Sequence, residues 1–495
     1  MKRNSSPDLA ASAPQSTLEG RLRRFFQPQN LAWWDSVLLG FLLLAMCSQF
    51  NLGDIGQDTT KQGYVTKQLK IALPDIALLL NFVWFLLRTT MLRAWKRLWW
   101  PPLPCWALIF AMIVATIHSP SIWDKIALVL EDVEDGTKTL AKTILTNKSS
   151  AQAIKEAIAE TIQFGLYFLV APWLFVNLLH DRRGGNSPSD AGQSTLEPVI
   201  DRRSFALSTL TLAFALSTLI ALRQSVGLMH GAPQALFGSP NAWAAFVAIT
   251  LPLLIAFVQI DDAMNKVRRF ALAFFALSLL TVFSPWATIA AIIGSAFAAL
   301  LLKGALKVRV GLVALLLLVF SGVLWIQQGP TDVRRAETLH VGSAQQKVKK
   351  QFIEWYAATA WALPGKRAFA NGVGPGNYQL NIGPYYGSGL PNEEKMPPDS
   401  NNLYLVQGVA QGALGLGALL WTISHFAALA WRARQSFAGD WLPAGLLGSF
   451  LSWAMVNIFH ASIVRGTGVV LAFLFALAVL AARDDQHINR EDEAR

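Results

Sequence analysis

The chain is organised as a series of long apolar runs separated by short polar segments. Within the runs, apolar residues follow one another without the regular spacing of a half-exposed helix or strand, and charged residues are almost absent. A run of about 18 or more such residues predicts a membrane-spanning helix. The pattern predicts twelve spans, at about residues 31–50, 71–87, 99–117, 162–179, 204–222, 242–260, 270–284, 286–302, 310–327, 402–425, 441–459 and 466–482. We therefore expect an all-α polytopic membrane protein.

The seventh and eighth predicted spans are short, and only Ser284, Pro285 and Trp286 separate them. Proline ends or bends a helix because it lacks a backbone N–H and its ring clashes with the preceding turn. Neighbouring helices then satisfy the freed carbonyl groups. We expect a tight, re-entrant-like corner at this point of the chain.

The basic residues indicate how the spans are oriented. Short cytoplasmic loops carry an excess of Lys and Arg, and with the N-terminus inside, every short inner loop has at least two of them. More than half of the 42 basic residues then lie on the inner side. We expect cytoplasmic tails at 1–30 and 483–495, with the spans in 31–327 and 402–482.

Two predicted outer segments are long. Residues 118–161 contain two stretches with helical apolar spacing, which indicates short amphipathic helices on the outer surface. Residues 328–401 form a larger loop between spans 9 and 10 that begins basic and helix-like and becomes rich in Gly, Pro, Asn and Tyr. A loop of this length in a membrane protein is usually functional or disordered, and its many aromatic residues argue against disorder. We expect a mainly helical periplasmic loop.

Composition supports the membrane class. The 495 residues are 53% hydrophobic and 15% charged, whereas soluble proteins have about 25% charged residues. The net charge of +11 follows largely from the orientation of the spans, so it gives no support to nucleic-acid binding. Cys47 and Cys105 lie inside apolar runs and are expected to pack as small buried thiols.

The densest group of candidate functional residues runs from Gly372 to Gly415. Three alternating glycines, Gly372, Gly374 and Gly376, allow a positive φ and a close backbone approach, and their successive amides can form an anion-binding nest; an ordinary turn is the simpler interpretation. The segment ends with the polar residues 399–402 before the tenth span. Gly412 and Gly415 lie on one face of that span, where small residues allow another helix to approach.

These motifs resemble the O-antigen ligase and polysaccharide polymerase superfamily. The shared features are the glycine segment ending in Tyr378, a polar outer loop, and a two-residue motif followed by nine residues and Gly-x-x-Gly. A Ser-Pro-Asn sequence ending at Asn241 opens the sixth span, and Arg223 lies shortly upstream. The resemblance covers roughly residues 204–482.

The resemblance implies a glycosyltransferase that needs no metal or cofactor and that works in the bacterial inner membrane. Its donor would be a glycan on undecaprenyl diphosphate, and its acceptor a glycan or a lipid. Further partners would be the lipid bilayer, a chain-length regulator and a flippase. A base would align the acceptor hydroxyl, and arginines would stabilise the charge on the leaving diphosphate.

Two motif positions depart from the family. Asn401 stands where the ligases have histidine and cannot act as a general base, and Ser284-Pro285 replaces an expected Ser-Arg. We take Asp399 as the first candidate base and His460 as the second, with His230 a weaker one. Arg223 and Arg465 lie at the edges of apolar runs, where an unpaired guanidinium is costly to bury, and are the candidate diphosphate ligands. The catalytic candidates are therefore Asp399, Asn401 and His460, and the substrate-binding candidates are Arg223, Arg465, Asn241, Asn402, Tyr404, Lys350, Arg367, Gly374, Gly376 and Tyr378.

Three functions remain open. A polymerase that joins lipid-linked repeat units into O-antigen or exopolysaccharide is favoured, because polymerases of the superfamily tolerate variation at the two-residue motif. A ligase would transfer the finished glycan to lipid A–core or to protein. A catalytically degenerate transporter or scaffold is less well supported, since the spans at 204–222 and 310–327 have no charged residue to line a polar path.

Overall fold

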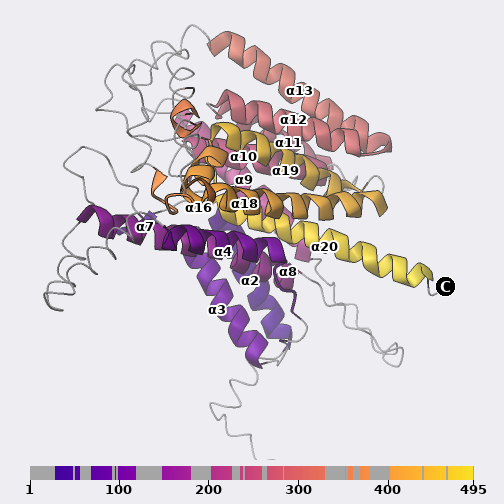
Figure 1. Ribbon diagram of the computed structural model, residues 1–495. Coiled ribbons are helices and arrows are strands. Elements are labelled where there is room, and N and C mark those ends of the chain that lie inside the picture. Colours follow the sequence, from indigo (N-terminus) through magenta and orange to yellow (C-terminus); the bar gives the residue numbers. More distant parts are fainter. Residues whose placement is uncertain are drawn as a thin grey trace, which may run out of the picture.

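The computed structural model shows a bundle of helices with one small antiparallel ribbon (Figure 1). It describes residues 28–47, 51–55, 69–91, 95, 98–118, 148–179, 202–225, 235–237, 240–258, 265–282, 284–328, 352, 355–359, 368–378, 402–436, 440–463 and 467–493. The elements are α2 (Pro28–Met46), β1 (Asn51–Ile55), β2 (Leu69–Ala72), α3 (Leu73–Met91), α4 (Leu103–Ile117), α7 (Lys148–Gly165), the π-helix η3 (Leu166–Val170), α8 (Ala171–Leu179), α9 (Arg202–Arg223), α10 (Pro240–Val258), α11 (Asn265–Leu280), α12 (Pro285–Leu301), α13 (Gly304–Gln328), α16 (Ala368–Asn371), α18 (Leu403–Ser436), α19 (Trp441–Phe459) and α20 (Thr467–Glu493).

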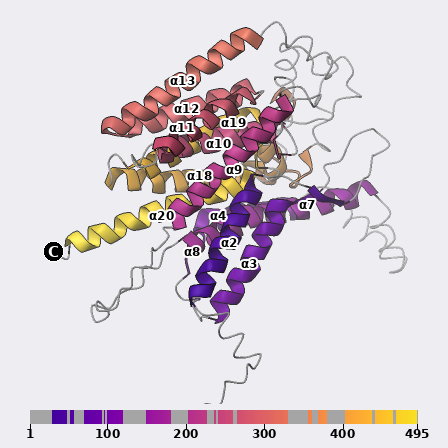
Figure 2. The same cartoon turned by 180° about the vertical axis from the view of Figure 1, so that it is seen from behind.

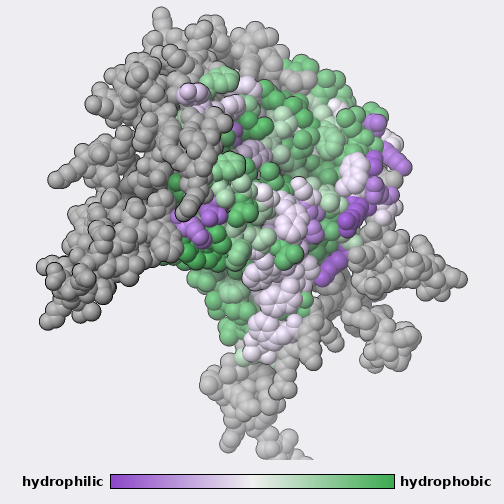
Figure 3. Space-filling view, viewed as in Figure 1, coloured by the Kyte–Doolittle hydropathy of each residue, from purple (hydrophilic) through white to green (hydrophobic). Residues whose placement is uncertain are grey.

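The helices are suited to a membrane. Six are long and apolar enough to cross one: Leu73–Met91, Ala157–Leu179, Arg202–Arg223, Pro240–Val258, Leu403–Ser436 and Trp441–Phe459. A helix lies at each of the twelve ranges predicted from the sequence, and the count of twelve spans itself stays a prediction. Figure 3 shows hydrophobic residues over most of the described surface of one face, with hydrophilic residues gathered toward two sides. The helical membrane class is confirmed.

The centre of the bundle is formed by α10, α12 and α19, which pack closely against one another. Around them, α18 packs against α4, α19 and α20, and α13 lies on the outside next to α12. Seen from both sides, α2 and α3 form a pair that is inclined to the other helices (Figures 1 and 2). The pair is joined to the rest mainly through the contact of α2 with α9.

Small residues bring α12 and α19 into close contact. A Cβ atom at Gly294 of α12 would overlap Ser452 and the carbonyl of Gly448, and one at Gly448 would overlap the carbonyl of Gly294. The Ser452 hydroxyl donates a hydrogen bond of 2.7 Å to the carbonyl of Ala290. Small residues and hydroxyl groups at such an interface let helix backbones approach in a membrane. The middle parts of α12 and α19 are therefore held firmly relative to each other.

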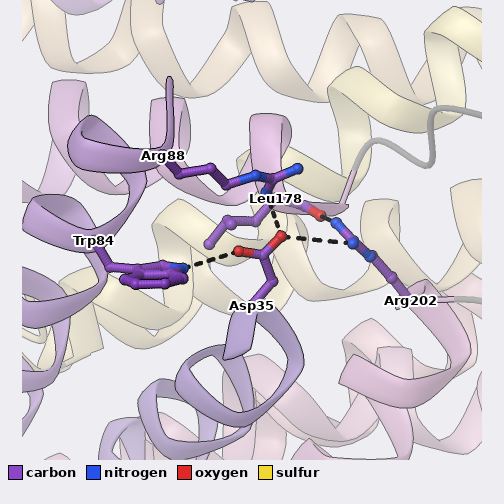
Figure 4. A network of polar contacts seen from close by, with 5 residues as sticks. All are labelled: Asp35, Trp84, Arg88, Leu178 and Arg202. Atoms are coloured by element: carbon purple, nitrogen blue, oxygen red, sulfur yellow. Dashed lines mark hydrogen bonds and ion pairs between the residues drawn. The ribbon is translucent and has the colours of Figure 1, made fainter. Parts of the chain in front are cut away.

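A buried ionic network joins the ends of four helices (Figure 4). The carboxylate of Asp35, 2% exposed, forms ion pairs with Arg88 and with Arg202, the latter at 3.5 Å. The indole of Trp84 donates to its other oxygen at 3.0 Å, and Arg202 also donates to the Leu178 carbonyl. These contacts place the start of α2, the end of α3, the end of α8 and the start of α9 on one side, as the predicted alternation of spans requires.

The structure adds a strand ribbon to the predicted organisation and gives the bounds of helices in two segments outside the predicted spans. Strands β1 and β2 pair antiparallel between α2 and α3, an element that the apolar pattern did not predict. Helix α7 covers the stretch expected to be helical near 151–160, and its place on the outer surface stays a prediction. The stretch expected near residue 123 lies outside the described residues. Helix α20 continues to Glu493, well into the predicted C-terminal tail.

Candidate functional site

The helix of the tenth predicted span is broken at Gly412, one of the two glycines that were expected to let a neighbouring helix approach. Gly412 has φ 69° and ψ −171°, which divides α18 into a short helix of residues 403–411 and a longer one of residues 413–436. Glycine adopts a positive φ without the clash that a Cβ atom would cause. A break inside a membrane helix frees backbone carbonyls, which need new donors in the protein interior.

The glycine segment supplies those donors. The amide of Val373 donates to the carbonyl of Val409 at 3.0 Å, and the amide of Gly374 donates to that of Ala410 at 2.9 Å. The approach is so close that a Cβ atom at Gly372 would overlap the backbone of α18, and one at Gly412 would overlap the end of α16. We call this backbone contact the glycine clasp. It gives the amides of Val373 and Gly374 a different role from the predicted anion nest, and substrate binding at Gly376 stays a prediction.

Apolar residues surround the clasp and connect it to α19. Tyr378, 3% exposed, packs in a small cluster with Val373, Val409 and the helical residues 357 and 358. Trp355, in the same helical turn, lies 5.9 Å from the ring of Phe459 at the end of α19. The predicted substrate ligand Tyr378 is therefore a core residue of this cluster. The large loop is anchored to the bundle here.

The first turn of α18 is fixed by two residues that the sequence suggested as ligands. The Asn402 side chain caps the helix, accepting hydrogen bonds from the amides of Tyr404 at 2.9 Å and Leu405 at 3.1 Å, as asparagine does at a helix N-cap. The Tyr404 hydroxyl donates to the carbonyl of Ala454 at 2.8 Å. Both residues join α18 to its surroundings, and a role in substrate binding stays a prediction.

His460 forms the main polar contact at this end of the bundle. It directly follows α19, and its Nε2 lies 2.5 Å from the hydroxyl oxygen of Ser284, the N-cap of α12. Trp286 stacks on Phe459 beside the pair, with ring centroids 4.0 Å apart. The structure thus joins two positions that are 176 residues apart in the chain.

Burial lowers the pKa of His460 to about 4, because the charged imidazolium loses its hydration. The imidazole is therefore neutral near pH 7 and has a nitrogen lone pair. The hydroxyl of Ser284 also accepts a hydrogen bond from the amide of Ala287. Nδ1 of His460 is buried and has no hydrogen-bond partner among the described residues. A neutral imidazole of this kind can accept a proton.

The turn after α19 is also held by side chains. Asn457, fully buried, accepts hydrogen bonds from the amide of Ser462 at 2.9 Å and from its hydroxyl at 2.8 Å. The amide of His460 continues the helix by donating to the carbonyl of Val456. His460 therefore lies in a turn that is fixed on both sides.

The remaining candidates fall into two groups. Arg223 at the end of α9 and Asn241 at the start of α10 are both exposed. The guanidinium of Arg223 is therefore not buried, and the cost of burying it gives no reason to expect an anion there. The other candidates lie outside the described residues: Lys350, Arg367, Asp399, Asn401 and Arg465, with the weaker candidate His230. Of the proposed catalytic residues, the structure gives contacts for His460.

Sequence reasoning missed several polar residues. Ser284 was considered as part of the corner between two spans and as a departure from the family motif, but not as a functional residue, although a Ser before Pro is a typical start of a helix. Gln407 and Gln411 are 1% and 0% exposed, and within the described part of the chain the side-chain oxygens of both and the nitrogen of Gln411 have no hydrogen-bond partner. The two glutamines are four residues apart, which places them on the same face of a helix. This spacing could have identified them from the sequence.

These features define a helical membrane protein with a buried histidine–serine pair where the start of α12 meets the end of α19. No protein-family model and no curated protein matches the chain. Among the described residues, no three His, Cys, Asp or Glu side chains lie together in a way that could hold a metal ion.

Proposed function

We propose that the chain is a membrane glycosyltransferase that polymerises undecaprenyl-diphosphate-linked repeat units into O-antigen or exopolysaccharide on the periplasmic side of a bacterial inner membrane. The observation that carries the proposal is the contact between His460 and Ser284. It is supported by the resemblance of residues 204–482 to the O-antigen ligase and polymerase superfamily, and by the glycine clasp that fixes the large loop nearby.

The reaction needs one proton acceptor and a stabilised leaving group. The acceptor hydroxyl oxygen bonds to the anomeric carbon of the donor while its proton passes to the base. The bond from that carbon to the diphosphate oxygen breaks with inversion, and undecaprenyl diphosphate leaves. Arg223 and Arg465 are the proposed ligands of the diphosphate, because guanidinium groups bind its oxygens in bidentate fashion.

We take His460 as the base because it is the catalytic candidate whose contacts are described, whereas Asp399 lies outside the described residues. A pKa of about 4 is low for a general base, whose pKa is best near the working pH. An anionic diphosphate bound beside His460 favours the imidazolium form and raises its pKa toward that range. Substrate binding would then prepare His460 for proton transfer.

A ligase is the second candidate, since the same site could transfer a finished chain to lipid A–core or to protein. A transporter or scaffold is the third. Among the described residues, the buried amide oxygen of Gln407, the buried amide of Gln411 and the hydroxyl of Ser449 on α19 have no hydrogen-bond partner, and these groups support a polar path more than the charge pattern did.

Mass spectrometry of lipid-linked glycans from a deletion strain tests the proposal. A polymerase predicts that single repeat units accumulate, and that the wild-type gene restores long chains while the H460A gene does not. Accumulation of long lipid-linked chains would indicate the ligase. Unchanged glycans would contradict both enzymatic functions and favour the transporter or scaffold.

A further inference from the structure

A π-helical turn interrupts one of the membrane-crossing segments. Residues 157–179 form an apolar segment long enough to cross a membrane, and η3 occupies its middle. A π-helical turn has poorer hydrogen-bond geometry than an α-helix and occurs frequently at functional sites. Here it contains Tyr167, which is 1% exposed.

Tyr167 connects three polar groups from different parts of the chain. Its hydroxyl donates to Oδ1 of Asp75 at 3.1 Å and accepts from the Nε2 of Gln163 at 3.1 Å. Asp75 lies in the first turn of α3 and is half-buried. An ionisable residue in a membrane-spanning segment is costly, and such residues usually have a function. The chain of hydrogen bonds keeps this carboxylate at the junction of α3 and η3.

The start of α20 completes the group. Gly468 lies against the ring of Tyr167 so closely that a Cβ atom there would overlap the ring. The preceding residue, Thr467, is 1% exposed, and its hydroxyl has no hydrogen-bond partner among the residues that the structure describes. A buried polar group without a partner is costly, because it has lost its hydrogen bonds to water. A ligand that hydrogen-bonds to Thr467 would offset this cost.

An acidic residue in the first turn of a helix also interacts favourably with the helix dipole, and this structural role alone would account for Asp75. It does not account for the π-helical turn or for the hydrogen bonds through Tyr167 and Gln163. A carboxylate, a phenol and a free hydroxyl offer the donors and acceptors that sugar hydroxyls need. Thr467 follows His460 by seven residues, which limits their separation to about 25 Å.

We infer that Asp75, Tyr167 and Thr467 form a subsite that binds the hydroxyl groups of a sugar residue in the lipid-linked glycan. The inference rests on the proposed function for its substrate class. It assigns recognition of the glycan to the contact of α3, η3 and α20, apart from the proposed site of reaction at His460 and Ser284.

Binding in detergent tests the subsite without requiring turnover. The two probes are glycan-bearing undecaprenyl diphosphate, extracted from the source bacterium, and undecaprenyl diphosphate without sugar. We expect the wild-type protein to prefer the first probe. D75N, Y167F and T467V should each reduce that preference about tenfold, the effect of one lost hydrogen bond, with binding of the sugar-free lipid unchanged. T161V is the matched control, because Thr161 is on α7 and hydrogen-bonds to Thr116 and Ala157 instead.

The outcomes separate the subsite from the proposed function. Equal binding of the two probes by the wild type, or variants that keep the full preference, would overturn the subsite and leave Asp75 with its helix-end role. Should D75N fail to fold, Y167F and T467V, which nearly preserve shape, decide the question. A clear preference in a protein whose deletion leaves lipid-linked glycans unchanged would overturn the polymerase and keep the subsite.

Discussion

The Asp35 network and the His460 pair are both buried polar clusters at helix ends, but their hydrogen bonding differs. At Asp35, both carboxylate oxygens have partners, and two arginines balance the charge. At His460, the imidazole is neutral and one ring nitrogen has no partner among the residues described, and two buried glutamines lie in α18, which packs against α19. A fully paired network stabilises one arrangement of helices. Unpaired buried groups indicate positions where a ligand or water can bind.

Removing the carboxylate of Asp35 is expected to give the largest loss of stability. D35A leaves Arg88 and Arg202 close together without their anion, and breaking a buried ion pair from one side costs about 3–5 kcal/mol. We expect much less folded protein by size-exclusion chromatography in detergent, with normal turnover per folded molecule. A folded but inactive D35A would place the Asp35 network in the active site. The Asp35 network would then not be purely structural, and it would no longer differ in role from the His460 pair.

Removing the imidazole of His460 should reduce activity and leave stability nearly unchanged, the reverse of what is expected for D35A. If it is the general base, H460A lowers polymer formation about 10²–10⁴-fold, while expression and thermal midpoint change little. S284A should have a smaller effect because it removes only the hydrogen bond that orients the ring. The comparison with D399N, assayed in vitro beside it, identifies the base: a near-wild-type H460A with a dead D399N would assign the role to Asp399.

The glycine clasp should be sensitive to a single methyl group. G412A places a Cβ atom against the backbone of α16 at a positive φ, where strain costs about 1–3 kcal/mol. We expect a lower thermal midpoint and a loss of activity of about tenfold. G417A is the matched control, since Gly417 lies on the same helix with open space around it. Equal effects of the two substitutions would mean that the clasp is unimportant.

Mild acid should act on His460 in a predictable direction. Its folded-state pKa is about 4, below the ordinary value of 6.5, so between these values the unfolded chain binds a proton that the folded protein does not. Stability therefore falls as the pH is lowered from about 6.5 to 4. The thermal midpoint of H460Q should fall less over this range than that of the wild type. Identical pH profiles would show that His460 is not buried as a neutral group.

The positions of the helices could be predicted from the sequence because apolar runs determine them directly. Which helices meet could not, since Asp35, Arg88 and Arg202 are far apart in the chain, as are Ser284 and His460. Nothing in a local pattern records such a pairing. The break at Gly412 was not predicted either. The spacing of Gly412 from Gly415 indicated a close-packed helix face, whereas in the structure Gly412 adopts a positive φ that interrupts the helix.

The break in α18 has a consequence for the depth of the bundle. Residues 413–436 form about 36 Å of helix, which already exceeds the roughly 30 Å hydrocarbon core of a bilayer. If these residues span the bilayer by themselves, the nine residues before Gly412 would turn aside at the headgroup level instead of lengthening the span. The glycine clasp would then hold them as a short shelf of protein at the water–lipid boundary. A molecule with a lipid tail and a polar head could approach this shelf sideways from the bilayer, with its tail remaining in the membrane.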